Sequence, residues 1–123
     1  MSDTVYTIAF VDDEFFMIYN PKRKGWEMPG GHIEPGEQVK EAAEREFLEE
    51  SGYTVNIIDM TEAHDCFICM GTLGKKICDG EMDGRTFKEL PKELSFDRSE
   101  YDEVIEWAYS VKQRQQSPKN NIG

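Results

Sequence analysis

Alternating apolar and polar positions predict the strands of this 123-residue chain. A period of two residues predicts strands from Val5 to Val11 and from Phe15 to Tyr19, joined into a hairpin by the turn residues Asp12 and Asp13. Later segments with a similar pattern are expected to form strands at residues 53–59, 63–71 and 81–87, the last after the turn residues Asp79 and Gly80. These segments supply the strands of a sheet.

Two segments change to the period of a helix. Residues 38–50 contain no Gly or Pro and are rich in Glu, Ala, Lys and Arg, and Gly52 is expected to end this helix. Ser99, with Asp102 three residues later, is expected to open a second helix. The apolar face of that helix comprises Tyr101, Val104, Ile105 and Ala108.

Length and composition fit one domain, expected at residues 1–111. The 38% hydrophobic and 11% aromatic content is ordinary for a globular protein. The polar segment 112–123 contains Pro118 and is expected to be a flexible C-terminal tail. The sequence shows no pattern of a signal peptide or membrane span, and three cysteines without framework spacing suit a reducing compartment. These features predict a cytoplasmic protein.

Three carboxylates of the first predicted helix give the strongest chemical signal. At about 100° per residue, Glu46 and Glu50 project from the middle of an apolar arc and Glu49 lies at its edge. The arc consists of Val39, Ala42, Ala43 and Phe47. Carboxylates placed on a core-facing stripe repel one another and lose hydration unless they bind protons or surround a cation. A solvated acidic helix face accounts for Glu41 and Glu44 but not for Glu46 and Glu50. Clustered oxygen ligands suit Mg²⁺ or Mn²⁺.

Residues around the helix extend this candidate site. Arg45 lies on the flank of the carboxylate stripe, within reach of Glu37 if the preceding loop folds back, and would then orient the site. Gly30 and Gly31 follow Pro29, a composition that favours a turn, and such a turn also leaves backbone carbonyls free to reach a metal.

These residues resemble the Nudix box, the signature of Mg²⁺-dependent hydrolases that cleave nucleoside diphosphates linked to another moiety. The matching positions are Gly31, Glu37, Arg45-Glu46-Phe47-Leu48-Glu49-Glu50 and Gly52-Tyr53, with Phe47 and Tyr53 where the pattern usually has aliphatic residues. The segment Gly25-Trp26-Glu27-Met28-Pro29-Gly30-Gly31 is similar to one in small triphosphate-cleaving (MutT-like) members, with Met28 in place of the commoner Phe. Residues 87–91 resemble the segment that usually precedes the last helix.

The resemblance implies the Nudix fold, an α/β (α+β) architecture with a mixed β-sheet sandwiched between helices. It implies that Glu46, Glu49 and Glu50 hold Mg²⁺, for which Mn²⁺ can substitute, and that the Gly30 carbonyl is a further ligand. Catalysis would rest on Glu50, Glu46, Arg45 and Glu37, the last two bracing helix and loop, together with a general base.

The general base in triphosphate-cleaving relatives can be a carboxylate from a loop well after the box. Glu81 is the first candidate, ahead of Asp83 and Glu89, although each is equally an ordinary surface acid. The expected reaction converts a nucleoside triphosphate, oxidised purine forms included, to a nucleoside monophosphate and pyrophosphate. Alternatives are an RNA 5′-end pyrophosphohydrolase, an ADP-ribose or dinucleoside polyphosphate hydrolase, and a non-catalytic nucleotide-binding module, which would usually lack a box glutamate.

The formal charge of −11 argues against binding a nucleic-acid backbone through a basic surface. A small nucleotide is the expected partner, with the protein a monomer or homodimer. The basic cluster Lys22-Arg23-Lys24 is either a phosphate clamp or a solvated turn. Trp26 could stack on a base or pack beneath the loop, and His32 could touch phosphate or remain solvated.

A second group of metal-ligating residue types is His64, Cys66, Cys69 and Cys78, which could bind Zn²⁺. In a strand, Cys66 and Cys69 would lie on opposite faces and could not meet one metal without a bulge. Cysteines that act as small buried hydrophobic residues are the favoured interpretation.

Overall fold

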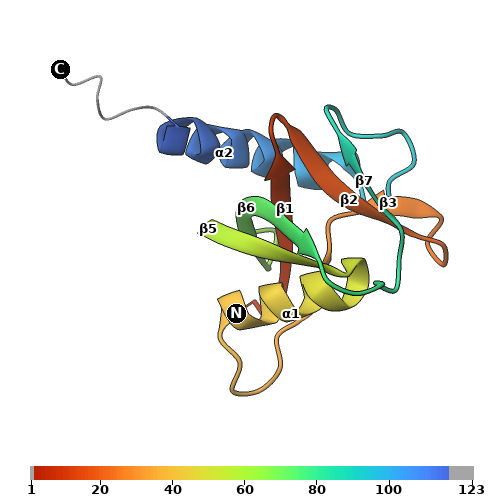
Figure 1. Ribbon diagram of the computed structural model, residues 1–123. Helices are drawn as coiled ribbons and strands as arrows, with labels where there is room; N and C mark the ends of the chain where they lie inside the picture. Colours follow the sequence, from red (N-terminus) through yellow and green to blue (C-terminus); the bar gives the residue numbers. More distant parts are fainter. Residues whose placement is uncertain (1, 117–123) are drawn as a thin grey trace.

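The computed structural model describes residues 2–116, which form a seven-stranded sheet and two helices. The strands are β1 (Thr4–Val11), β2 (Glu14–Asn20), β3 (Gly25–Glu27), β4 (Gly30–His32), β5 (Tyr53–Ala63), β6 (Cys66–Lys76) and β7 (Gly84–Phe87). The helices are α1 (Val39–Ser51) and α2 (Arg98–Gln116). Figure 1 shows the sheet between α1 on one side and α2 on the other. The predicted fold class is confirmed.

The sheet is mixed. Its strand order is β3-β2-β1-β6-β5, with β4 also paired to β1 and β7 also paired to β2. β1 and β6 run parallel, and the other pairs are antiparallel. β1 and β2 form the predicted hairpin, in which Phe10 lies opposite Phe15. The parallel pair brings the first strand of the chain beside a strand from the second half of the domain, at the centre of the sheet.

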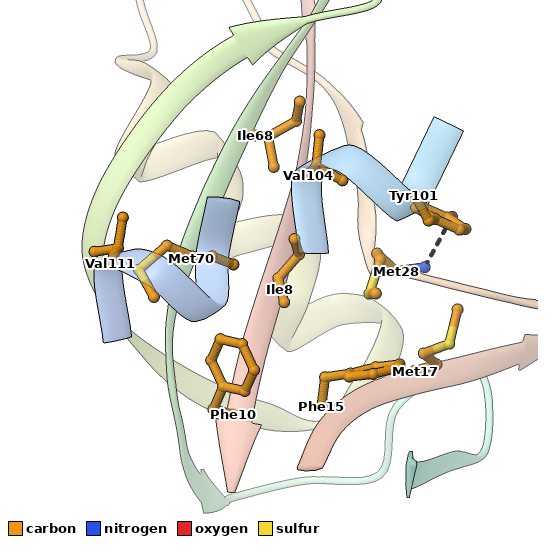
Figure 2. Close-up of a cluster of buried hydrophobic side chains, with 11 residues drawn as sticks. Ile8, Phe10, Phe15, Met17, Met28, Ile68, Met70, Tyr101, Val104 and Val111 are labelled. Atoms are coloured by element: carbon orange, nitrogen blue, oxygen red, sulfur yellow. Dashed lines mark hydrogen bonds between the residues drawn. The ribbon is translucent and has the colours of Figure 1, made fainter. Parts of the chain in front are cut away.

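Both faces of the central strands are buried because a helix covers each of them. On the α2 side, Ile8, Phe15 and Ile68 belong to a cluster that packs against α2, which contributes Tyr101 and Val104 (Figure 2). On the α1 side, a second cluster contains Ala9, Phe16, Ile18 and Phe47. Consecutive residues of β1 and β2 therefore enter different cores, which explains why these strands are apolar at almost every position.

Several strand boundaries differ from those predicted. His64 and Asp65, expected to begin a strand, form the two-residue turn between β5 and β6 with φ values of 50° and 57°. Positive φ at both turn residues matches the twist of a hairpin. β6 therefore begins at Cys66 and continues to Lys76 instead of Gly71, while β5 reaches Ala63. β7 begins at Gly84 instead of Glu81, and the short strands β3 and β4 were not predicted.

The second helix differs from its prediction at both ends. Asp97, not Ser99, caps α2, because its carboxylate accepts the Ser99 backbone N–H at 3.0 Å and the Ser99 hydroxyl at 2.9 Å. The helix continues to Gln116, so the predicted tail does not begin at Lys112. The rest of that tail, residues 117–123, lies outside the described residues. No helix within residues 2–116 is long and apolar enough to cross a membrane.

Candidate active site

The ends of α1 fix the orientation of its carboxylates. At the first turn, the Gln38 backbone N–H donates to the Glu41 carboxylate at 2.9 Å. At the last turn, Gly52 adopts the left-handed conformation (φ 83°) and donates its N–H to the Leu48 carbonyl at 2.8 Å. Between these ends, Ala42, Ala43 and Phe47 are buried against the sheet. Burial of this face turns the side chains of Glu46 and Glu50 toward the glycine pair that follows Pro29.

Glu46 and Glu50 lie against Gly30 and Gly31. The Gly30 backbone N–H donates to Glu50 Oε1 at 2.9 Å. A Cβ placed on Gly31 would lie 2.5 Å from the carboxylate carbon of Glu46, so a side chain at position 31 would displace that carboxylate from its present place. Both carboxylates are therefore held beside the backbone of this loop.

The electrostatic environment disfavours charge on these two carboxylates. Burial, reinforced by the charges of Glu46, Glu27 and Glu81, raises the pKa of Glu50 to about 7, although the Gly30 N–H opposes the rise. Burial also raises the pKa of Glu46, while hydrogen bonding to Arg45 opposes this rise. A cation placed between these carboxylates would offset the unfavourable burial of their charges.

Arg45 joins the helix to the preceding loop, and its contact with Glu37 is confirmed. Nε and Nη2 of Arg45 donate to the two oxygens of Glu37 at 2.6 and 2.9 Å, the bidentate geometry of a strong ion pair. Nη2 also donates to the His32 carbonyl at 3.1 Å, and Nη1 donates to Glu46 at 3.1 Å and to Glu49 at 3.4 Å. The hydrogen bonds from Arg45, aided by the Glu34 backbone N–H, lower the pKa of Glu37 to about 2, and the hydrogen bonds to Glu37 and Glu46 raise the pKa of Arg45.

The backbone of Glu81 contacts the C-terminal end of α1. Its N–H donates to the Glu49 carbonyl at 3.2 Å, and the charge of Glu81 is among those that raise the pKa of Glu46 and Glu50. The other two general-base candidates lie elsewhere: Asp83 accepts the Tyr19 N–H through its carbonyl at 2.9 Å, and Glu89 lies beside α2. Of these three acids, Glu81 is the one whose backbone contacts the end of the helix that carries the box carboxylates.

A cavity of about 390 Å³ opens beside Gly30 and Gly31. It lies between the sheet and the first turn of α2, where the Met28 N–H donates to the Tyr101 hydroxyl at 3.2 Å (Figure 2). Its volume lies within the range of about 300–1,000 Å³ that is usual for small-molecule sites. Its lining residues are Thr4, Val5, Tyr6, Arg23, Glu27, Met28, Gly30, Gly31, His32, His64, Cys66, Phe96, Glu100 and Tyr101.

Arg23 is the member of the basic cluster that reaches the cavity. Its Nη1 donates to both oxygens of Glu27, at 3.0 and 3.1 Å, and its guanidinium lies 5.1 Å from the centre of the Phe96 ring. Lys22 and Lys24 are exposed and do not line the cavity. Glu27 is only 5% exposed and was not predicted as a site residue, since the sole signal was its place in the glycine-rich segment.

Trp26 does not line the cavity. It packs between Tyr19 and Phe87, with ring-centre distances of 5.3 and 4.9 Å, and Arg85 covers its ring. Of the two roles considered for Trp26, its position therefore supports packing and not stacking on a base. Phe96, which was not predicted, is the exposed aromatic residue at the cavity, with 42% of its surface accessible.

The cysteine and histidine side chains are distributed over both sides of the sheet. Cys69 is buried with Ala42 and Ala43 on the α1 side, whereas His64 and Cys66 line the cavity on the α2 side. Cys78 is exposed after β6. Within residues 2–116, no three His, Cys, Asp or Glu side chains converge closely enough to hold a metal ion. The box carboxylates do not converge in this way either, since Glu46 and Glu49 accept hydrogen bonds from Arg45.

Comparison with known proteins identifies the family. The family model of the NUDIX domain matches residues 3–113. The chain belongs to the Nudix family. This Nudix chain is 61% identical over 48 residues to a Bacillus subtilis (strain 168) protein provisionally named an 8-oxo-dGTP diphosphatase, a match that covers 37% of the chain and 32% of that relative. The curated relatives are matched over a third or less of their own length.

Solved Nudix structures share the fold. A UDP-X diphosphatase is similar with a TM-score of 0.69 at 18% identity, over 94% of this chain and 64% of the other. MutT, analysed from Aliivibrio salmonicida and Vibrio cholerae, is similar with a TM-score of 0.61 at 25% identity, over 89% of this chain and 97% of the other. The family match supports the prediction of a pyrophosphohydrolase, and Nudix hydrolases generally depend on divalent metals.

Proposed function

We propose that this Nudix protein hydrolyses a nucleoside triphosphate in the presence of Mg²⁺ and releases a nucleoside monophosphate and pyrophosphate. The observation that carries the proposal is the position of Glu46 and Glu50, half-buried against Gly30 and Gly31, two residues that also line a nucleoside-sized cavity. Buried acids with raised pKa values beside a ligand-sized cavity are typical of functional sites.

The chemistry of the carboxylates fits a divalent cation. Glu46, Glu49 and Glu50 supply only oxygen ligands, which Mg²⁺ prefers, and the Gly30 carbonyl would add another. Glu49 is half-exposed, so its side chain is free to turn from Arg45 toward its neighbours. When bound, the metal would lower the pKa of a coordinated water and neutralise charge on the phosphates, and Mn²⁺ would substitute for Mg²⁺.

The residues of the chain then have separate tasks. The oxygen of a water molecule forms a bond to one phosphorus of the α–β bridge, the bond from that phosphorus to the bridging oxygen breaks, and one water proton passes to the Glu81 carboxylate. Arg45 and Glu37 hold the glycine loop on the helix. Arg23, placed by Glu27, donates to a phosphate oxygen from the cavity side.

The cavity accommodates the nucleoside. Phe96 presents an exposed ring at the cavity, with Arg23 against it, and a base stacks well on such a surface. A base at this position would direct the phosphates toward Gly30 and the box carboxylates, with His32 beside them. Because a triphosphate offers more oxygens to the metal and Arg23, we expect it to be preferred over a diphosphate. The 8-oxo-dGTP diphosphatase name of the matched relative favours purines, oxidised guanine included.

Other functions are separated by substrate. An ADP-ribose or dinucleoside polyphosphate hydrolase and an RNA 5′-end pyrophosphohydrolase would use the same carboxylates on a larger partner. A non-catalytic binding module is disfavoured because every glutamate of the box is present. The net charge of −11 disfavours a polymeric partner, and we expect a cytoplasmic monomer or homodimer that acts on a small nucleotide.

A nucleotide screen tests the proposal. Purified protein with Mg²⁺ is offered nucleoside tri- and diphosphates, 8-oxo-dGTP, ADP-ribose, a dinucleoside polyphosphate and 5′-triphosphorylated RNA, while phosphate and pyrophosphate release are measured. We expect a triphosphate to give the highest kcat/KM, with pyrophosphate as product. Hundredfold faster turnover of ADP-ribose or a dinucleoside polyphosphate would overturn the substrate assignment alone. Absence of turnover on every substrate would overturn the hydrolase assignment.

A further inference from the structure

The segment between β6 and β7 docks on the C-terminal end of α1 through its backbone. The N–H groups of Ile77 and Cys78 donate to the Gly52 carbonyl at 2.9 and 3.4 Å. Farther along the segment, the N–H groups of Glu81 and Met82 donate to the carbonyls of Glu49 and Glu50 at 3.2 and 2.9 Å. The last carbonyls of a helix have no partner within the helix, so this segment satisfies those of two box glutamates.

Gly80 lies at the centre of this contact. A Cβ on Gly80 would lie 2.5 Å from the Glu50 carbonyl oxygen and 2.6 Å from the Gly52 nitrogen, and it would also overlap the Ser51 carbonyl carbon. These are backbone atoms, which cannot turn aside as a flexible side chain can. Gly80 does not have positive φ, unlike Gly52, so its role is to permit close approach and not an unusual backbone conformation.

We propose that Gly80 is a positioning residue, whose missing side chain lets residues 77–82 dock on α1 and thereby holds the adjacent Glu81 beside the box carboxylates. The inference rests on the proposed function, in which Glu81 accepts the proton of the attacking water. With a side chain at position 80, the segment would have to move away from Ser51 and would carry Glu81 with it. A catalytic group displaced by about 1 Å can lose about 100-fold in rate.

A double-mutant cycle tests this role. The variants are Gly80→Ala, Glu81→Gln and the double variant, each measured for kcat and KM on the best triphosphate with saturating Mg²⁺. We expect Gly80→Ala to lower kcat about 100-fold and to change KM little, because the cavity residues are untouched. In the Glu81→Gln background, Gly80→Ala should change kcat by no more than about twofold, since the group through which it acts is already gone.

Controls separate positioning from folding. Ile77→Ala changes an exposed side chain in the same segment without adding a clash, and it should keep the parental kcat. The Mg²⁺-induced rise in Tm should persist in Gly80→Ala, which would show intact box carboxylates. Should Gly80→Ala fail to fold, Met82→Pro, which removes the N–H donated to Glu50, is used in the same cycle.

Three outcomes would overturn the inference. If the losses of Gly80→Ala and Glu81→Gln multiply in the double variant, Gly80 acts through the helix or the fold and not through Glu81. If Glu81→Gln alone keeps the parental kcat, the positioning role and the base assignment fail, while metal-dependent hydrolysis stands. If the parent itself turns over no nucleotide with Mg²⁺, the proposed function fails as well.

Discussion

Glu50 has an environment unlike that of a surface acid. Its carboxylate is held against the Gly30 N–H and surrounded by other acids, which together with burial raises its pKa from 4.5 to about 7. The position of Glu46 and Glu50 on the apolar arc was the sequence feature that predicted this environment. The Gly30 contact could not be predicted, since it depends on a loop that lies twenty residues away.

Glu50→Gln should stabilise the metal-free protein. Without metal at pH 8, the parent holds an ionised Glu50 in an unfavourable site, and a neutral side chain should raise the free energy of unfolding by about 1–3 kcal/mol. Because the pKa of Glu50 is higher in the folded than in the unfolded state, the parent should lose stability as pH rises from about 4.5 to about 7. Chemical denaturation in EDTA at pH 5 and pH 8 measures both effects.

Glu44→Gln is the matched control, because Glu44 lies on the exposed face of the same helix. It should change the free energy of unfolding by less than about 0.5 kcal/mol. If the free energy of unfolding of the parent and of Glu50→Gln changed equally with pH, Glu50 would not be the group with the raised pKa.

Arg45→Ala should lose both stability and rate. The variant removes the hydrogen bonds that Arg45 donates to Glu37, Glu46 and the His32 carbonyl and weakens the attachment of the glycine loop to α1, so we expect Tm to fall by about 5–10 °C. The low pKa of Glu37 means that this ion pair stabilises the fold above about pH 4.5 and ceases to do so as pH falls toward 2. In thermal melts from pH 3 to pH 7, acidification should therefore lower the Tm of Arg45→Ala less than the Tm of the parent. Arg45→Lys should recover only part of the stability that Arg45→Ala loses. An unchanged Tm would refute the bracing role.

At the scale of elements, long periodic segments were predictable and short ones were not. Both helices have enough turns to show their period, and β1 and β2 are long apolar segments separated by the turn residues Asp12 and Asp13. β3 and β4 have three residues each, too few for a pattern, and they exist because they pair with β2 and β1. His64 and Asp65 adopt the left-handed conformation in the turn between β5 and β6. Neither is a glycine, the residue type whose presence would have predicted this turn from the sequence.

Pairing at the sheet edge decides which aromatic residue faces the cavity. The Trp26 N–H donates to the Glu93 carbonyl at 2.8 Å, and the Ser95 N–H donates to the Trp26 carbonyl at 3.0 Å. This pairing fixes the segment that carries Phe96 beside the cavity, while the Trp26 side chain packs on Phe87. Sequence alone could not separate the two, because both are aromatic residues near the predicted site.

Phe96→Ala and Trp26→Ala should therefore differ. Loss of a stacking surface that acts equally in ground state and transition state should raise KM for the best triphosphate about tenfold in Phe96→Ala, with kcat nearly unchanged. Trp26→Ala should instead lower the free energy of unfolding by about 2–4 kcal/mol through lost packing. Steady-state kinetics and denaturant unfolding of both variants check this. If Trp26→Ala raised KM more than Phe96→Ala did, and kept the stability of the parent, Trp26 and not Phe96 would be the residue that stacks on the base.

At the scale of the whole molecule, the fold gathers residues that are distant in sequence. The cavity combines β1 and the glycine loop with Phe96 and the first turn of α2, and Glu81 reaches the C-terminal end of α1 from the segment between β6 and β7. The Nudix box was sufficient to predict that Glu46, Glu49 and Glu50 lie close together, because all three belong to one helix. The cavity wall could not be predicted, because its residues share no local pattern.

Metal binding should stabilise the whole domain. A cation that binds only the folded state raises the free energy of unfolding by about 2.7 kcal/mol when its free concentration is 100 times its dissociation constant. Millimolar Mg²⁺ or Mn²⁺ should therefore raise Tm, and Glu49→Gln should weaken that rise, whereas Glu44→Gln should preserve it. A Tm indifferent to both metals, with or without nucleotide, would contradict the metal site.

The most direct test of the central claim is the rate of Mg²⁺-dependent pyrophosphate release from the best nucleoside triphosphate by the parent and by Glu50→Gln. If the half-buried carboxylates of α1 carry the reaction, Glu50→Gln should lower kcat by about 100-fold or more while remaining folded. EDTA should abolish turnover by the parent. Near-parental turnover by Glu50→Gln at saturating Mg²⁺ would contradict the account.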